Sequence, residues 1–409
     1  MKRVSLIALL SANVISMIGN VFATIAIPWF VLQSTGSTIK TGITGFSMTI
    51  AAVLASFFGG TIIDRLGFKP TSIIADITSA LAFSCIPLLY SLGRLEYWLL
   101  LILVFIGNLL DAPGTTAREA LLPDLAAKAG LRLEQASALI QAVDRGARML
   151  GAPLAGLLVT SLGTQNVIWI DALSFMLSAL IVSLAIPNRK KPERGASNEK
   201  HYFSELKEGL NFIAGDKLLF SIILMVLVTN FIDAPLSGVI YPVFFQQFFG
   251  SALDLGFVLS ASGAGALITA LLFGAIGYKL PRRWLFFGGF FLISLRFFIF
   301  AQVPPVWVLI LISLITGMAS GPINPIISTI SYERIPLEFR GRVLGTMTSI
   351  SYIAMPLGTA LAGFVLEAVD VRTVLILMGM IYCLTILAAF FSPSIRDMGI
   401  SQNIEVQKG

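Results

Sequence analysis

Long apolar runs alternate with short polar segments along almost the whole chain. Each run is continuous, and each has roughly the 20 residues that a helix needs to cross a bilayer. Only helices and closed barrels span lipid, and unbroken apolar runs favour helices. The pattern predicts twelve spanning helices, at residues 4–32, 39–63, 71–92, 97–118, 136–162, 165–187, 217–245, 254–278, 284–302, 305–331, 343–366 and 372–392.

One long polar stretch divides these runs into two groups of six, which predicts an all-α polytopic membrane protein with two pseudo-symmetric bundles. We expect an N-terminal six-helix bundle at residues 1–187 and a C-terminal six-helix bundle at 217–392. A cytoplasmic linker at 188–216 joins them, and a cytoplasmic tail follows at 393–409. Within the linker, residues 203–214 have the pattern of a short amphipathic helix.

Composition and charge agree with this architecture. The 409 residues are 56% hydrophobic and 12% charged, with a mean hydropathy of +0.88, which excludes a soluble protein. Among the basic residues outside the predicted spans and at their ends, only Lys40, Arg94 and Arg372 fall on the side opposite the termini. The positive-inside rule then places both termini in the cytoplasm. The net charge of +6 is therefore explained by topology, and no nucleic-acid partner is expected.

Polar side chains recur at helical spacing on the first, fourth, seventh and tenth predicted spans. Such spacing places each set on one helical face. Polar groups are costly in lipid, so four such faces indicate a water-filled substrate cavity. The alternative for each residue is a contact that holds two helices together. The predicted cavity residues are Asn13, Asn20, Asn108, Thr115, Asn230, Ser237, Tyr241, Ser320 and Asn324.

Three acids within the spans are candidates for proton coupling. Asp111 and Asp233 lie on the polar faces of the fourth and seventh spans, each followed by Ala-Pro, and Asp144 lies in the fifth. A carboxyl that exchanges a proton for a substrate would couple the two. The structural alternatives are a permanent pair of Asp111 with Arg118 and an i, i+4 pair of Asp144 with Arg148.

Other intramembrane charges have less obvious roles. Arg296 in the ninth span has no local partner in the sequence, and neither has Asp233 within its own span. Asp76 and Asp171 lie nearer span ends, where we expect them to tie helices together.

The fifth span carries small residues and a proline. Gly151 and Gly156 would let a neighbouring backbone approach closely. Pro153 removes a helix hydrogen bond and favours a bend. We interpret these three residues as a bending segment, with plain helix packing as the alternative.

The loop between the second and third spans carries the most specific motif. It runs Gly60-Thr-Ile-Ile-Asp64-Arg65-Leu66-Gly67-Phe68-Lys69-Pro70. A glycine can take positive φ at the corner, and the basic residues hold the loop in the cytoplasm. This stretch resembles the signature loop of the major facilitator superfamily of transporters. The resemblance implies a conformational-switch role for Gly60, Asp64, Arg65, Gly67 and Lys69.

Further stretches resemble the macrolide-efflux-like branch of bacterial drug:proton antiporters. They are Arg118-Glu-Ala-Leu-Leu-Pro-Asp, Gly151-Ala-Pro and Ile170-Asp-Ala-Leu-Ser-Phe. The resemblance implies a monomeric secondary transporter that exports amphipathic small molecules of drug, macrolide or siderophore type by proton-coupled alternating access. Its partners would be the substrate, protons and the bilayer, with no cofactor and no metal.

Two alternative functions stand beside this one. An uncoupled facilitator or flippase for a lipid or metabolite would share the same fold. An intramembrane enzyme is disfavoured, because the sequence has no zinc-binding His-Glu-x-x-His, no Walker loop and only one histidine, His201.

Overall fold

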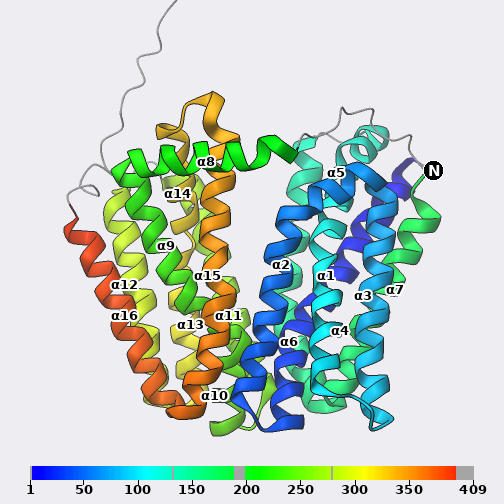
Figure 1. The fold of residues 1–409 in the computed structure, drawn as a ribbon, viewed down its shortest axis with the longest axis horizontal. Helices are drawn as coiled ribbons and strands as arrows, with labels where there is room; N and C mark the ends of the chain where they lie inside the picture. The colour runs from blue at the N-terminus through cyan, green and yellow to red at the C-terminus, as the bar shows by residue number, and fades with distance from the viewer. Residues whose placement is uncertain (1, 131–132, 188–198, 278–279, 393–409) are drawn as a thin grey trace, which may run out of the picture. The chain divides into compact units, whose positions relative to one another are not determined.

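The computed structural model describes residues 2–130, 133–187, 199–277 and 280–392, and every regular element in these ranges is a helix (Figure 1). Among the described residues, 11 helical stretches are long and apolar enough to cross a membrane. A shorter apolar stretch, Gly146–Leu162, lies within one further helix. The predicted all-α, multi-span architecture is confirmed.

The helices of the first half of the chain follow the predicted spans. They are α1 (Lys2–Thr35), α2 (Thr38–Leu66), α3 (Phe68–Ser91), α4 (Tyr97–Leu109), α5 (Asp111–Ala129), α6 (Leu133–Leu162) and α7 (Thr164–Ala185).

The second half begins with the linker helix and contains two short helices of other types. Its elements are α8 (Glu199–Gly215), α9 (Lys217–Pro235), the π-helix η1 (Leu236–Ile240), α10 (Tyr241–Phe248), α11 (Ala252–Ile276), α12 (Arg282–Ala301), α13 (Val306–Ser320), α14 (Ile323–Arg334), the 3₁₀ helix η3 (Leu337–Phe339), α15 (Arg340–Ala368) and α16 (Val371–Phe391).

Three predicted spans are interrupted inside the apolar run. The fourth span breaks at Leu110 between α4 and α5, the seventh becomes a π-helix after Pro235, and the tenth breaks between α13 and α14 before Pro322. Proline removes a helix hydrogen bond and clashes with the preceding turn, which explains breaks beside it. The fourth span also continues as α5 to Ala129, well beyond the predicted end at residue 118.

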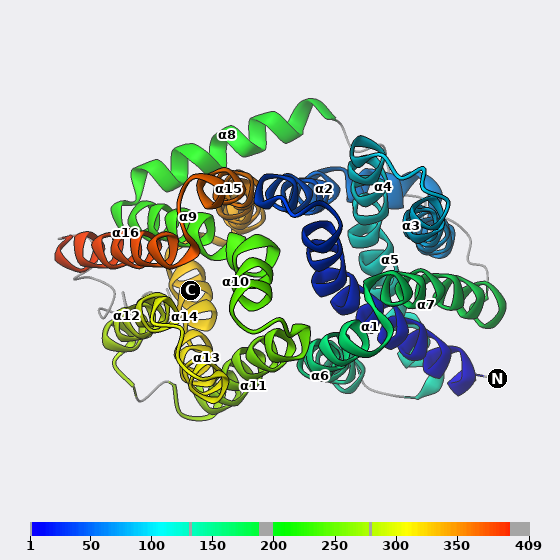
Figure 2. The ribbon, with the colours of Figure 1, turned by 90° about the horizontal axis from the view of Figure 1, so that it is seen from below.

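The helices pack into two compact units. The first comprises Met1–Ser197, Ala234–Ser260 and Met355–Val369, and the second Asn198–Asp233, Ala261–Ala354 and Asp370–Gly409. In the first unit, α1 lies along α7 and α6, and α3 lies along α7 and α5 (Figure 2). In the second, α12 lies beside α16 and α13 (Figure 2).

The turn between α2 and α3 follows from one residue. Gly67 has φ +87°, which an L side chain rarely adopts, as the sequence predicts for this corner. Its N–H donates to the Ile63 carbonyl at 2.7 Å, and its own carbonyl accepts the Thr71 hydroxyl at 2.7 Å. The turn therefore ends α2 and begins α3 within a single residue.

The linker helix α8 is held to the start of α15. Glu208 accepts a hydrogen bond of 2.5 Å from Arg342, and the rings of Phe212 and Phe339 stack with centroids 6.0 Å apart. Gly209 lies so close to α15 that a Cβ would meet the Thr346 hydroxyl. The helix that the sequence predicts at residues 203–214 is confirmed and slightly longer.

Candidate functional site

A fully buried ion pair joins α3 and α5 in the first unit. Arg118 of α5 is 0% exposed and donates to Asp76 Oδ1 of α3 at 2.7 Å. Its Nε donates to Asn13 Oδ1 at 3.0 Å, and its Nη2 donates to the hydroxyls of Ser16 and Thr115, each at 3.1 Å. The guanidinium is therefore bonded from α1, α3 and α5 together, as a buried charge requires.

The other oxygen of Asp76 is also bonded. The Ser178 hydroxyl of α7 donates to Asp76 Oδ2 at 2.7 Å. Asp76 therefore ties helices together, as expected, but from a buried position. The alternative that pairs Arg118 with Asp111 is not found, because Arg118 bonds Asp76. Arg118 also does not end the fourth span, since α5 continues past it to Ala129.

Asp111 is held by α1. Asn20 Nδ2 lies 3.0 Å from Oδ1 and 3.0 Å from Oδ2 of Asp111, so the amide nitrogen donates to both carboxylate oxygens. Both residues are only partly buried. Asp111 is also the first residue of α5, where the helix dipole favours a negative charge. The predicted polar faces of the first and fourth spans therefore meet each other in this conformation.

Asp233 is the corresponding acid of the second unit. Arg296 of α12 donates to its Oδ1, and the Tyr382 hydroxyl of α16 donates to Oδ2 at 3.2 Å. The Asp233 side chain stays 33% exposed, whereas that of Arg296 is 16% exposed. The structure thus pairs two charges whose partners were not evident within their own spans. Asp233 lies just before the π-helix η1, and such interruptions recur at functional sites.

The remaining predicted cavity residues divide by their exposure. Asn13 is 1% exposed and bonded to Arg118, so the expectation that it lines a cavity is not met in this conformation. Tyr241 is also buried, at 6%, with its ring against Phe245. Helix-to-helix contact, the alternative that the sequence leaves open, describes Asn13, whereas the ring contact of Tyr241 lies within α10.

Other residues of this set are partly or fully accessible. Asn108 donates to the carbonyl of Val104 in its own helix, and Asn230 donates to the Ser351 carbonyl of α15 at 2.9 Å. Ser237, Ser320 and Thr115 are half-buried, and Asn324 is exposed. These side chains are therefore accessible enough to line a cavity, as the sequence predicts, although the structure does not test that role.

The predicted switch loop has one unexpected contact. Lys69 Nζ donates to the carbonyls of Ser183 and Ile186, at 2.9 and 2.5 Å, and so caps the C-terminal end of α7. Arg65 is exposed. The side-chain environments of Gly60, Asp64 and Asp144 lie outside the described residues.

The predicted bending segment of α6 makes two different contacts. A Cβ at Gly151 would lie 3.0 Å from a methyl group of Val21 on α1. A Cβ at Gly156 would lie 2.4 Å from the Ala252 carbonyl of α11, so α11 approaches the backbone there. Pro153 lies inside α6, which continues to Leu162.

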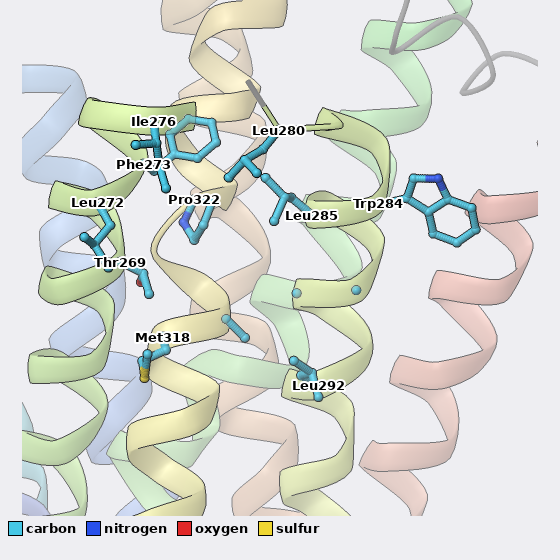
Figure 3. Close-up of a pocket in the computed structure, with 13 residues that line it drawn as sticks. Thr269, Leu272, Phe273, Ile276, Leu280, Trp284, Leu285, Leu292, Met318 and Pro322 are labelled. Atoms are coloured by element: carbon cyan, nitrogen blue, oxygen red, sulfur yellow. The ribbon is translucent and has the colours of Figure 1, made fainter. Parts of the chain in front are cut away.

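An apolar cavity of about 380 Å³ lies within the second unit, between α11, α12 and the junction of α13 with α14. In Figure 3, Leu272 and Phe273 of α11 lie on one side, Leu285 and Leu292 of α12 on the other, and Met318 lies between. The sequence does not predict this cavity, because apolar side chains on lipid-crossing helices carry no distinguishing pattern.

The sequence analysis also did not identify the ion-pair partners of Arg118 and Asp233. An unpaired charge inside a span is costly, so each lone charge implies an opposite one nearby. That rule, applied across spans, makes Asp76 one candidate partner for Arg118 and Arg296 one for Asp233, without selecting between them and the other intramembrane charges. Tyr382 carries no comparable signal.

Comparison with known proteins gives one family. The sequence profile of the Major Facilitator Superfamily matches this chain over residues 9–237 and again over 226–405. The multidrug efflux pump Tap of Mycolicibacterium fortuitum is 29% identical over 404 residues, 98% of each chain. Macrolide efflux protein A of Streptococcus pyogenes is 23% identical over 383 residues, 92% of this chain and 93% of its own.

Solved structures share the fold. That of the nucleoside transporter NupG matches with a TM-score of 0.78 at 14% identity, over 94% of this chain and 98% of its own. At this identity the likeness concerns the arrangement of helices alone.

Proposed function

Because the chain belongs to the major facilitator superfamily, and so is a transporter of small molecules, we propose that it exports amphipathic drugs of the macrolide or lipophilic-cation type. Two relatives that match almost its full length are named as a multidrug efflux pump and a macrolide efflux protein. We further propose that export is driven by protons through alternating access, that the chain acts as a monomer, and that it lies in a bacterial inner membrane with both termini in the cytoplasm.

The environment of Asp233 is the observation that best supports proton coupling. This carboxylate is one-third exposed, yet Arg296 and Tyr382 both donate to it. A proton arriving on the carboxyl would weaken its bond to Arg296, and a cationic substrate would compete with Arg296 for the same oxygens. Proton and substrate then exclude each other at one site, which is the requirement for antiport.

Asp111 offers a second such position. The side chain that donates to it, Asn20, is a neutral amide, so protonation does not break this contact as it would an ion pair. Both Asp111 and Asp233 lie at or near helix interruptions and are only partly buried, which suits a carboxyl that exchanges protons with water. The two acids therefore support a coupling role in different ways.

A second candidate function is uncoupled movement of a lipid. The apolar cavity between α11 and α12 favours it, because its lining suits an alkyl chain. This alternative predicts substrate movement that ignores the pH gradient.

The test uses purified protein in inside-out proteoliposomes with an acidic lumen. Radiolabelled erythromycin and ethidium serve as the probes, with a protonophore to collapse the gradient. Accumulation that depends on the gradient supports proton-coupled export. Equal uptake with and without the gradient contradicts coupling and favours a facilitator, and movement of a labelled phospholipid in place of both probes favours a flippase.

A further inference from the structure

Asp171 of α7 is a buried acid that no part of the proposed mechanism uses. It is 0% exposed, and neither of its carboxylate oxygens has a hydrogen-bond partner among the described residues. The sequence predicts that it ties helices together, and the structure contradicts this. An ionised carboxylate enclosed without a partner is strongly disfavoured, whereas a protonated carboxyl is neutral.

The carboxyl is covered by the backbone of α1. A Cβ at Gly19 would lie 2.6 Å from Asp171 Oδ1 and 2.0 Å from the Ser174 hydroxyl, so a larger residue there requires these side chains or α1 to move. The Ser174 hydroxyl donates to the main-chain carbonyl of Asp171 at 2.7 Å, so it does not donate to the carboxyl. The side chain is therefore sealed as long as α1 lies against α7.

Within the described part of the chain, no nearby cation neutralises this acid. Arg118 is fully engaged by Asp76 and by hydroxyl and amide groups, and Lys69 caps the far end of α7. Arg148 of α6 is exposed and has interactions of its own.

One helix touches both acids. Asn20 of α1 donates to Asp111, while its neighbour Gly19 covers Asp171. The same helix buries Asn13 Nδ2 without a hydrogen-bond partner among the described residues, so its polar groups are not all satisfied in this arrangement. A shift of α1 would change the surroundings of both carboxyls at once.

We propose that Asp171 is an additional proton-binding residue of the transport cycle. It keeps its proton while Gly19 covers it, and releases that proton to water when α1 moves away from α7, which leaves a hydrated carboxylate. This inference rests on the proposed proton-coupled export. In this proposal, the movement of α1 controls when the proton leaves Asp171.

The first test does not depend on transport. Infrared difference spectroscopy of the purified protein at neutral pH, without substrate, reports the C=O stretch of protonated carboxyls and its shift in heavy water. Asp171→Asn should remove one such signal, whereas Asp370→Asn, at an exposed acid, should leave it unchanged. A spectrum that Asp171→Asn does not alter overturns the proposal, whether or not the protein is a proton-coupled exporter.

The second test asks whether the proton is used. In the proteoliposome assay, Asp171→Asn should lower gradient-driven accumulation of ethidium and erythromycin at least severalfold while downhill exchange continues. Its thermal stability should equal that of the wild type, because a neutral acid is replaced by a neutral amide. Wild-type accumulation in this variant would make the carboxyl structural only and would overturn the proposal.

A variant of the covering residue completes the design. Gly19→Ala combined with Ser174→Ala removes the hydroxyl that the new methyl group would meet and separates α1 from Asp171 by a small distance. The protonated-carboxyl signal should then be lost at a lower pH than in the wild type, with Ser174→Ala alone as the matched control. An unchanged titration would contradict the covering role of α1. If wild-type protein shows no gradient dependence at all, the proposed coupling fails while the infrared result still decides the state of Asp171.

Discussion

Gly156 of α6 and Gly256 of α11 make a reciprocal contact. A Cβ at Gly156 would lie 2.4 Å from the carbonyl oxygen of Ala252, and a Cβ at Gly256 would lie 2.4 Å from that of Ala152. Each glycine thus contacts the peptide four residues before the other. Close approach of membrane helices through small residues makes such a contact sensitive to added volume.

We expect Gly156→Val to impair transport because α6 and α11 can no longer meet. Overpacking of a close contact costs about 1–3 kcal/mol, which corresponds to a roughly 5- to 150-fold shift between two states. The matched control is Gly146→Val in the same helix, where a Cβ meets no atom within 4 Å. Initial rates of ethidium export at equal protein levels check this, and equal rates in the two variants would contradict it.

Buried and exposed ion pairs should differ sharply in their contribution to stability. Arg118→Ala leaves the buried Asp76 carboxylate unpaired, which we expect to cost about 3–5 kcal/mol. Arg342→Ala breaks the pair with Glu208, whose side chains are 40% and 44% exposed, and should cost about 0–1 kcal/mol. Thermal unfolding of both variants in the same detergent measures the difference. Similar unfolding midpoints in the two variants would show that the ion pair of Arg118 with Asp76 does not stabilise the protein more than the exposed pair does.

Helix periodicity allowed the fold to be predicted, but not the pairing of the charges. The positive φ of Gly67, the linker helix and the membership of the transporter superfamily all followed from local sequence. Periodicity places Asp111 and Asn20 on polar faces, yet it cannot say which faces meet. The end of the fourth span was predicted too early, at residue 118, because its helix becomes less apolar while remaining buried against other helices.

The exposed acid Asp370 should stabilise the start of α16 in a pH-dependent way. Hydrogen bonds from the hydroxyl and the N–H of Thr373 hold the pKa of Asp370 below its usual value. A lowered folded-state pKa gives stability that is present above the unfolded value of about 3.9 and is lost as the pH falls through the folded value. Asp370→Ala should therefore lower the unfolding midpoint at pH 7, and the difference from wild type should vanish in acid. A difference that persists below both pKa values would contradict this interpretation of the cap.

Orientation in the membrane can be checked with single cysteines. The native Cys85 and Cys383, both half-buried and free, are first replaced by alanine. In intact cells an impermeant thiol reagent should label Ser91→Cys, at the end of the third span, and should not label Glu338→Cys, which precedes α15. Both positions are exposed. Labelling of Glu338→Cys from outside would reverse the topology that the basic residues predict.

The pair of Asp233 with Arg296 allows coupling to be separated from structure. Asp233→Asn removes the carboxylate that pairs with Arg296, a guanidinium only 16% exposed, so both stability and gradient-driven accumulation should fall. Adding Arg296→Gln removes the positive charge of the guanidinium as well, and stability should return toward that of the wild type. If Asp233 binds the coupling proton, accumulation in the double variant should stay abolished while downhill exchange recovers, because no carboxyl has been restored. Proteoliposome transport and thermal unfolding, measured on both single variants and on the double variant, give the two readouts. Recovery of accumulation together with stability would show that the acid serves only to neutralise Arg296, and the coupling role would pass to Asp111.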